Sequence, residues 1–198
     1  MKTEIEAKFL DIDPGAIRNT LKQIGARCVY SEQLQKRKIF DSPDHHMERV
    51  GGCVWVREEN GKITLAYKQL NNRTLQGTKE VSVRVDDFDR ACEFLLDIGL
   101  VLRSYQETRR EQWLYQSVEI TIDTWPWIPT FLEIEAPTEV EVRKTAAALG
   151  LEWERALFGS VEIAYQQNYD VTEQEVDSWP SATFTDIPQD LLKKRKRK

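Results

Sequence analysis

Two hydrophobic periodicities alternate along this chain. Apolar residues three or four positions apart predict amphipathic helices at residues 13–25, 87–99 and 138–150. Each of these segments begins with Asp or Thr, which cap helix N-termini well, and ends at a glycine. The pattern therefore predicts three helices of similar design, separated by segments of another kind.

In the intervening segments, apolar and polar residues alternate one by one, as expected of a β-strand with one buried face. Such strands are predicted at residues 35–41, 53–58, 62–69, 79–85, 103–115 and 117–124. Asn60-Gly61, between two of them, is a typical hairpin turn. Nearly every strand has one apolar face and one charged face.

Two acidic segments have the same alternation: Glu4-Ile5-Glu6-Ala7-Lys8 and Glu133-Ile134-Glu135-Ala136. Because a strand turns successive side chains to opposite faces, each segment places two carboxylates on one face. Carboxylates stacked this closely repel one another, so the arrangement is unfavourable unless cations lie between them. With these two segments the strands number about eight.

Two architectures fit such strands. A β-sandwich would leave the charged faces in solvent, whereas a closed barrel would place the apolar faces under the helices and the charged faces in its interior. The types of charge favour the barrel. The strands supply carboxylates and also Lys8, Arg57, Lys68 and Arg110, a combination that suits a metal-chelated polyanion.

Composition limits the class of protein. With 198 residues, 40% of them hydrophobic and 31% charged, the chain suits one generous domain with charges inside it. No apolar run approaches the roughly 20 residues of a membrane span, and the first residues lack the character of a signal peptide. We therefore expect a soluble, cytoplasmic protein with no membrane partner.

The remaining features predict little specific chemistry. Cys28, Cys53 and Cys92 are widely spaced, which indicates reduced thiols, and His45 and His46 are expected at the surface. The net charge is -5, although residues 193–198 are all basic. We expect this basic tail to be disordered and solvated, with no specific nucleic-acid partner.

The motifs resemble those of the CYTH proteins, also called triphosphate tunnel metalloenzymes. The ExExK strand of that family is matched by Glu4, Glu6 and Lys8, and its late acidic strand by Glu133 and Glu135. Further strands are similar in matching order, including Val54-Trp55-Val56-Arg57 and Thr64-Leu65-Ala66-Tyr67-Lys68. The resemblance implies an α+β fold, a closed antiparallel eight-stranded β-barrel that forms a tunnel, with helices on the outside. It assigns residues 1–170 to the tunnel domain and residues 171–198 to a C-terminal extension.

The resemblance also implies the site. Mg²⁺ or Mn²⁺ would be held by Glu4, Glu6, Glu133 and Glu135, with Glu80 and Asp123 in support, and Glu4 or Glu6 would orient the nucleophile. The phosphate chain would be bound by Lys8, Arg57, Lys68 and Arg110, together with Arg37 and Arg84. Two positions depart from the family pattern: Ser82 follows Glu80 where a second acid is usual, and Thr108 stands where many members have a basic residue.

Three functions follow from this resemblance. The first is metal-dependent hydrolysis of an inorganic, thiamine or nucleoside triphosphate, and the second is a class IV adenylyl cyclase that converts ATP to cAMP and pyrophosphate. The third is a non-catalytic polyphosphate-binding module. The expected partner is a small-molecule triphosphate, and the sequence leaves a homodimer open, because the segment from Asp170 to Pro188 could cover a tunnel mouth or a dimer contact.

Overall fold

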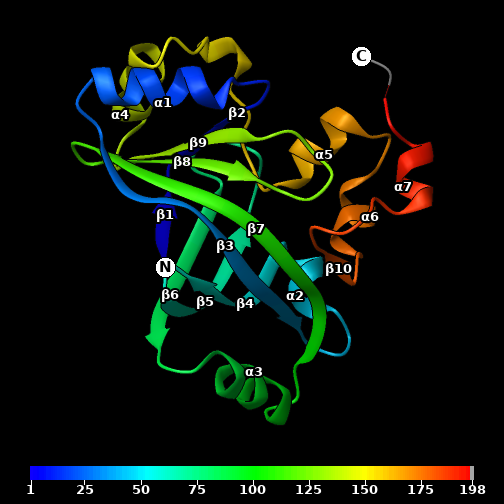
Figure 1. The fold of residues 1–198 in the computed structure, drawn as a ribbon. Helices are drawn as coiled ribbons and strands as arrows, with labels where there is room; N and C mark the ends of the chain where they lie inside the picture. Colours follow the sequence, from blue (N-terminus) through cyan, green and yellow to red (C-terminus); the bar gives the residue numbers. More distant parts are fainter. Residues whose placement is uncertain (197–198) are drawn as a thin grey trace.

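The computed structural model describes residues 1–196, which form one long antiparallel sheet with helices on its outer side (Figure 1). The strands are β1 Lys2–Glu4, β2 Glu6–Phe9, β3 Arg27–Asp41, β4 Gly52–Glu59, β5 Lys62–Leu70, β6 Thr78–Val85, β7 Val101–Tyr115, β8 Val118–Thr124, β9 Phe131–Glu135 and β10 Ser181–Ala182. The helices are α1 Pro14–Gln23, α2 His46–Arg49, α3 Phe88–Asp97, α4 Glu139–Ala148, α5 Glu162–Asn168, α6 Glu173–Asp177 and α7 Gln189–Lys193, with a 3-10 turn at Trp153–Arg155.

The sheet curls into a nearly closed barrel in the order β1-β6-β5-β4-β3-β7-β8-β9-β2. The α+β fold and the antiparallel barrel predicted from the sequence are therefore confirmed. The strand count rises from the predicted eight to ten for two reasons: the short β10 pairs in parallel with β7 outside this order, and the predicted first strand is divided at Ile5. Its first half, β1, pairs with β6, and its second half, β2, pairs with β9, so this one segment joins the two edges of the sheet.

The three predicted helices are present, and their ends follow the sequence. The side chain of Asp13 accepts hydrogen bonds from the amides of Gly15 and Ala16, and Asp87 and Thr138 cap α3 and α4 in the same way. Gly25, which follows α1, has φ +79°, a conformation that glycine adopts without strain. Local sequence thus determines where these helices begin and end.

The apolar faces of the strands lie outside the barrel. Helices α1 and α4 cover one side, where Leu21 and Val142 pack over Ile120, Leu132 and Ile134, all of them fully buried. Helix α3 covers another side through Phe88 and Leu95, which pack against Phe40 and Val56. The charged faces consequently point into the barrel.

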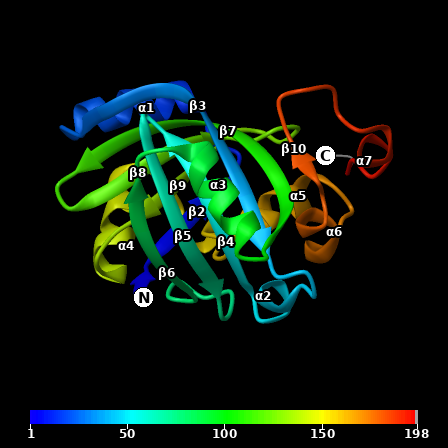
Figure 2. The ribbon, with the colours of Figure 1, turned by 90° about the horizontal axis from the view of Figure 1, so that it is seen from below.

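The C-terminal helices form a third cluster at the end of the barrel opposite the N-terminus (Figures 1 and 2). Tyr165 of α5 is buried against Trp125, and its hydroxyl donates to the carbonyl of Pro126 at 3.0 Å. Val176 of α6 and Leu191 of α7 belong to the same buried cluster, so the segment beyond Tyr169 packs on its own chain beside one end of the tunnel. Among the described residues, no helix is long and apolar enough to cross a membrane.

The basic tail is partly placed. Lys193 ends α7, Lys194 pairs with Glu175, and the ammonium of Lys196 donates to the carbonyl of Gln166 at 2.6 Å. The sequence led us to expect a solvated tail from Lys193 onward, but these contacts hold its first part against α5 and α6. Arg197 and Lys198 lie outside the described residues.

Candidate active site

A cavity of about 1220 Å³ runs through the barrel, and we call it the tunnel. Most of the side chains predicted from the sequence line it: Glu4, Glu6, Lys8, Arg37, Arg57, Lys68, Glu80, Arg110, Glu133 and Glu135. Asp123 and Arg84 do not. Residues that are far apart in the chain are therefore brought to one interior surface, as alternation predicted.

Lys8 lies between two buried carboxylates. Its ammonium nitrogen is 3.1 Å from Glu6 Oε1 and 3.1 Å from Glu133 Oε2. Strand β2 pairs with β9 so that Lys8 is directly opposite Glu133, which places all three groups on the interior face. Although burial lowers the pKa of Lys8, the charges of Glu133 and Glu6 outweigh this effect and raise it.

Glu6 and Glu133 share this space unequally. Burial, with the charge of Glu133 next, raises the pKa of Glu6 to about 7. Burial acts on Glu133 in the same direction, but Lys8 and Arg110 lower its pKa below the usual range. At neutral pH Glu133 is therefore ionised and Glu6 is about half protonated, so the proton of the pair lies on the Glu6 side.

Lys68 ties the two halves of the first strand together. Its ammonium is 3.0 Å from Glu4 Oε2 on β1 and 4.0 Å from Glu6 Oε1 on β2. Burial lowers the pKa of Lys68, and the negative charges of Glu6 and Glu4 raise it well above the ordinary value. Lys68 thus remains charged and is positioned at the seam of the barrel.

A second acidic group lies nearer the N-terminus, where Glu4, Glu80 and Glu135 meet. Burial and the charge of Glu4 raise the pKa of Glu80 and of Glu135. Lys2 is the nearest cation to Glu135, at 3.5 Å, and its side chain is 78% exposed. Lys68 pairs with Glu4, whereas Glu80 forms no ion pair in the described chain and Glu135 has only the exposed Lys2. This set of oxygen donors fits a hard divalent cation.

The described carboxylates are not yet arranged as a metal shell. Among residues 1–196, no group of three or more His, Cys, Asp or Glu side chains has converged on one point. The reason is visible in the contacts, because Lys8 and Lys68 occupy the spaces between Glu4, Glu6 and Glu133. Glu4, Glu80 and Glu135, which lie together nearer the N-terminus, are the carboxylates that could hold a metal there.

Arg37 and Arg57 lie side by side on the tunnel wall, because the pairing of the neighbouring strands β3 and β4 places them directly opposite each other. Arg57 is 2.9 Å from Glu59 and stacks on Trp55, whereas Arg37 donates to the amide oxygen of Gln106. Burial and the charge of Arg57 lower the pKa of Arg37 to about 10. Arg37 forms no ion pair with a carboxylate of the described chain, so it is available to an anionic ligand.

Asp123 is placed differently from the other predicted acids. It is 1% exposed, and Arg110 donates to both of its oxygens, at 2.6 and 2.8 Å. Burial lowers the pKa of Arg110, but the Asp123 carboxylate raises it well above the ordinary value. Asp123 therefore fixes Arg110 at the tunnel wall and does not face the cavity.

The two departures from the family pattern are also resolved in space. Ser82 lines the tunnel beside Glu80 without supplying a second carboxylate. The guanidinium of Arg109 stacks on Phe184 at 4.6 Å, outside the barrel, so it does not replace a basic residue at Thr108. Arg84 is exposed and lies away from the cavity, although Thr64 pairs with it on one side and with Arg57 on the other.

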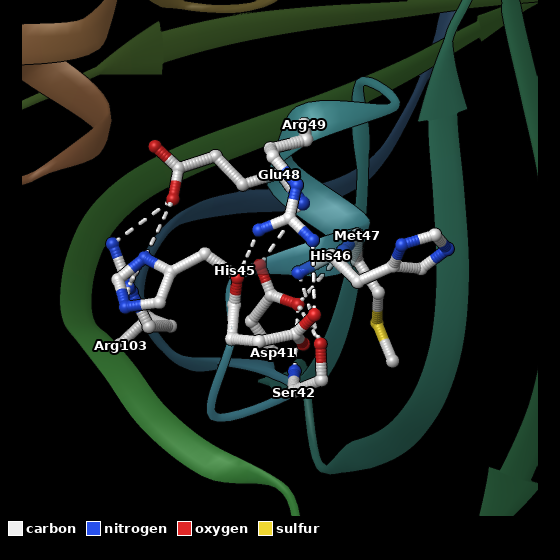
Figure 3. A network of polar contacts seen from close by, with 9 residues as sticks. Asp41, Ser42, His45, His46, Met47, Glu48, Arg49 and Arg103 are labelled. Carbon is white, nitrogen blue, oxygen red and sulfur yellow. Dashed lines mark hydrogen bonds and ion pairs between the residues drawn. The ribbon is translucent and has the colours of Figure 1, made fainter.

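Sequence reasoning missed several lining residues. Glu119, opposite Glu135, has the alternation of an interior residue, so its position could have been inferred. Glu162 and Asp177 come from the short helices α5 and α6, which show no useful periodicity. Helix α2 adds a polar network at the same end of the tunnel, with Asp41 at its centre (Figure 3).

The α2 network is held by backbone amides and ion pairs. The carboxylate of Asp41 accepts hydrogen bonds from the amides of Ser42, Met47 and Glu48. Glu48 also pairs with Arg103 at 3.1 Å and with His45 at 3.2 Å, while His46 points away (Figure 3). Both histidines are exposed, as predicted, but His45 belongs to the tunnel wall.

Comparison with known proteins agrees with this architecture. A protein of Methanocaldococcus jannaschii described as a "putative adenylate cyclase" is 22% identical over 133 residues, which cover 67% of this chain and 75% of that protein. A Vibrio parahaemolyticus structure of the same description has a TM-score of 0.72 at 16% identity and covers 83% of this chain and 98% of its own. A Hippeastrum structure, described as revealing a dominant triphosphatase activity, has a TM-score of 0.53 at 14% identity, covering 89% and 95%.

The CYTH domain model matches residues 2–163, which include every strand of the barrel and both acidic segments. The match thus spans the tunnel and the motifs that build it. This chain belongs to the CYTH domain family.

Proposed function

We propose that this protein hydrolyses a triphosphate in its tunnel with the help of a divalent cation, Mg²⁺ or Mn²⁺. One observation carries the proposal: the same cavity holds carboxylates without a close buried cation and an arginine without a carboxylate partner. Burial and like charge raise the pKa of Glu80 and Glu135, whereas Arg37 has no carboxylate partner among the described residues and a lowered pKa. A metal-chelated triphosphate supplies both a cation and an anion at once.

The residues divide the work by position. Glu4, Glu80 and Glu135 would hold the cation, which neutralises charge on the phosphates and lowers the pKa of bound water. Arg37 and Arg57 would bind phosphate oxygens with their planar guanidinium groups, and Lys68 adds a point charge at the seam. Positioning and charge neutralisation contribute most of the catalysis in phosphoryl transfer.

The proton of the attacking water needs an acceptor. Glu6 is suited to this role because its pKa of about 7 leaves a substantial ionised fraction at neutral pH. As the water oxygen bonds to the terminal phosphorus, its proton passes to the Glu6 carboxylate and the bond to the bridging oxygen breaks. The leaving phosphate chain keeps its contacts with the arginines.

A second candidate function is cyclisation of ATP. The relatives described as adenylate cyclases favour it, and a cavity of about 1220 Å³ has room for a nucleoside beside the phosphate chain. The Hippeastrum protein, in contrast, favours hydrolysis. In the cyclase the ribose 3′-hydroxyl would attack the α-phosphorus and pyrophosphate would leave.

Product analysis tests the proposal. The protein is incubated with Mg²⁺ or Mn²⁺ and with tripolyphosphate, thiamine triphosphate or ATP, and both orthophosphate and cAMP are measured. Orthophosphate release supports hydrolysis, whereas cAMP with pyrophosphate identifies a cyclase. Binding of all three compounds without any turnover would instead identify the polyphosphate-binding module.

Glu4→Gln provides the matching residue test. Losing a metal-holding carboxylate should lower turnover by about a hundredfold or more. Arg84→Gln is the control, because it removes a charge from the same sheet but outside the tunnel. If Glu4→Gln and Arg84→Gln retained equal activity, the assigned role of Glu4 would be wrong.

A further inference from the structure

Two carboxyl groups meet at the end of the tunnel that the C-terminal helices cover. Glu162 begins α5 and Asp177 ends α6, and their side chains lie within hydrogen-bonding reach of each other. Both line the tunnel. Two carboxylates cannot hydrogen-bond to each other, so either a proton or another positive group must lie between them.

Glu162 also has an unused acceptor. The residue is only 9% exposed, and its Oε2 atom has no hydrogen-bond partner among the described residues. A buried carboxylate oxygen without a partner is unfavourable because its lost hydration is not replaced, and such atoms in folded proteins normally have a hydrogen-bond partner. Glu162 is one of the residues that line the tunnel, a cavity large enough to admit a ligand.

The other acids at this end already have partners. Asp41 accepts backbone amides, Glu48 pairs with Arg103, and Glu173 pairs with Arg73. Asp44 pairs with Arg49 at 2.9 Å. In the described chain neither Glu162 nor Asp177 forms an ion pair, although the charges of Arg37 and Lys8 act on Glu162 from a longer distance. These two are therefore the acids at this end that lack a close cation.

We propose that Glu162 and Asp177 form a cation-binding site at the covered end of the tunnel, separate from Glu4, Glu80 and Glu135. The ligand is a positive group that lies between the two carboxylates. Two kinds of ligand supply such a group: a triphosphate with a cationic organic end, whose phosphates occupy the middle of the tunnel, or a free divalent cation. The first kind rests on the proposed function, and the second does not.

Binding measurements in the intact protein distinguish these two kinds of ligand. In EDTA, calorimetric titration compares thiamine triphosphate, whose thiazolium ring is positive, with tripolyphosphate, which has no organic end. If the site takes the organic cation, Glu162→Gln weakens thiamine triphosphate by at least about tenfold and leaves tripolyphosphate within twofold. If the site takes a free cation, titration with Mn²⁺ alone shows one fewer bound equivalent in the variant.

Asp177→Asn is the second variant and is expected to act in the same direction, and thermal melting confirms that each variant folds. Glu173→Gln is the matched control, since Glu173 lies on the same helix but already has Arg73. If neither Glu162→Gln nor Asp177→Asn changed thiamine triphosphate affinity or Mn²⁺ stoichiometry beyond the control, the pair would be a protonated structural contact and the proposal would be overturned. Because the readout is binding, a failed turnover assay leaves this test intact, and tripolyphosphate binding reports on the proposed function separately.

Discussion

Lys8 offers a sharp test of how the tunnel is held together, because its ammonium is the shared counter-ion of two buried carboxylates. It is 5% exposed and lies 3.1 Å from both Glu6 and Glu133. Replacing it with methionine keeps the length of the side chain but removes the charge. Glu133 would then keep only the more distant cations, and Glu6 would keep only Lys68 at 4.0 Å.

The size of the effect follows from burial. Removing one partner of a buried ion pair destabilises a protein by about 3–5 kcal/mol, because the remaining charge is left uncompensated. For a chain of this length, each kcal/mol lowers the melting temperature by about 2–4 °C, so Lys8→Met should lower it by about 6–20 °C. Glu6→Gln should differ from wild type by only about 1 kcal/mol, because a carboxyl with a pKa of about 7 is already half protonated at pH 7.

Urea denaturation at pH 7 in EDTA measures both variants. Lys2→Met is the matched control. Lys2 lies on β1, the other half of the divided first segment, but its side chain is 78% exposed, and its pair with Glu135 should contribute less than about 1 kcal/mol. If Lys8→Met lost no more stability than Lys2→Met, the reasoning from burial would be refuted. If Lys8→Met and Glu6→Gln lowered the free energy of unfolding equally, Glu6 would not be half protonated at pH 7, and the assignment of the proton to Glu6 would be wrong.

Three further predictions concern other parts of the barrel. Burial and the charge of Glu162 raise the pKa of Asp177 to about 8, so its contribution to stability is present below about pH 4 and is lost as pH rises through 8. In urea denaturation, Asp177→Asn should therefore be more stable than wild type at pH 9 but not at pH 4. Equal stability of the two proteins at pH 9 would contradict the raised pKa. Arg57→Gln should raise the KM for a triphosphate by about tenfold to a hundredfold, while Arg84→Gln stays within twofold, as steady-state kinetics would show; similar values for the two would place Arg57 outside the binding site. Gly77→Ala would put a Cβ 1.9 Å from the backbone oxygen of Asn72 and should lower the free energy of unfolding by about 1–3 kcal/mol or more. Gly61→Ala meets no atom within 4 Å, so only its φ of +69° counts against it, and it should lower that free energy by about 1–2 kcal/mol. If thermal melting ranked the two variants the other way, the loop before β6 would relax freely.

Alternation along the strands determined which face each residue takes, and this was enough to predict most of the tunnel. It could not determine the height of a residue along the tunnel axis. Arg57 and Arg84 are both paired with Thr64 and so lie on the same face of the sheet, yet only Arg57 lines the cavity. Height depends on the stagger between strands, which is set by the closure of the whole barrel and is not visible in any one strand.

Pairing within the interior was equally hidden. Alternation along β8 predicts that Asp123 faces the interior with the metal-binding acids. The register of β7 and β8 places it opposite Arg110, which donates hydrogen bonds to both of its carboxylate oxygens. The pair at Glu162 and Asp177 depends on how α5 and α6 pack over the tunnel, and these helices are too short to show a periodicity. Contacts between distant elements, and not local propensity, decide the charge state of such groups.

The division of the first strand explains why its acidic motif lies where the charges are least balanced. Because the chain leaves β6 and joins β9 at Ile5, Glu4 lies beside Glu80 of one edge while Glu6 lies beside Glu133 and Glu135 of the other. A continuous strand within a sheet would have neighbours on both sides along its whole length. Here each half has a strand partner on one side only, and on its other side β2 hydrogen-bonds to Leu75 and Leu157 in connecting segments. The seam that closes the barrel is therefore also the place where carboxylates from both edges meet, and a cation bound there would stabilise the closure as well as bind phosphates.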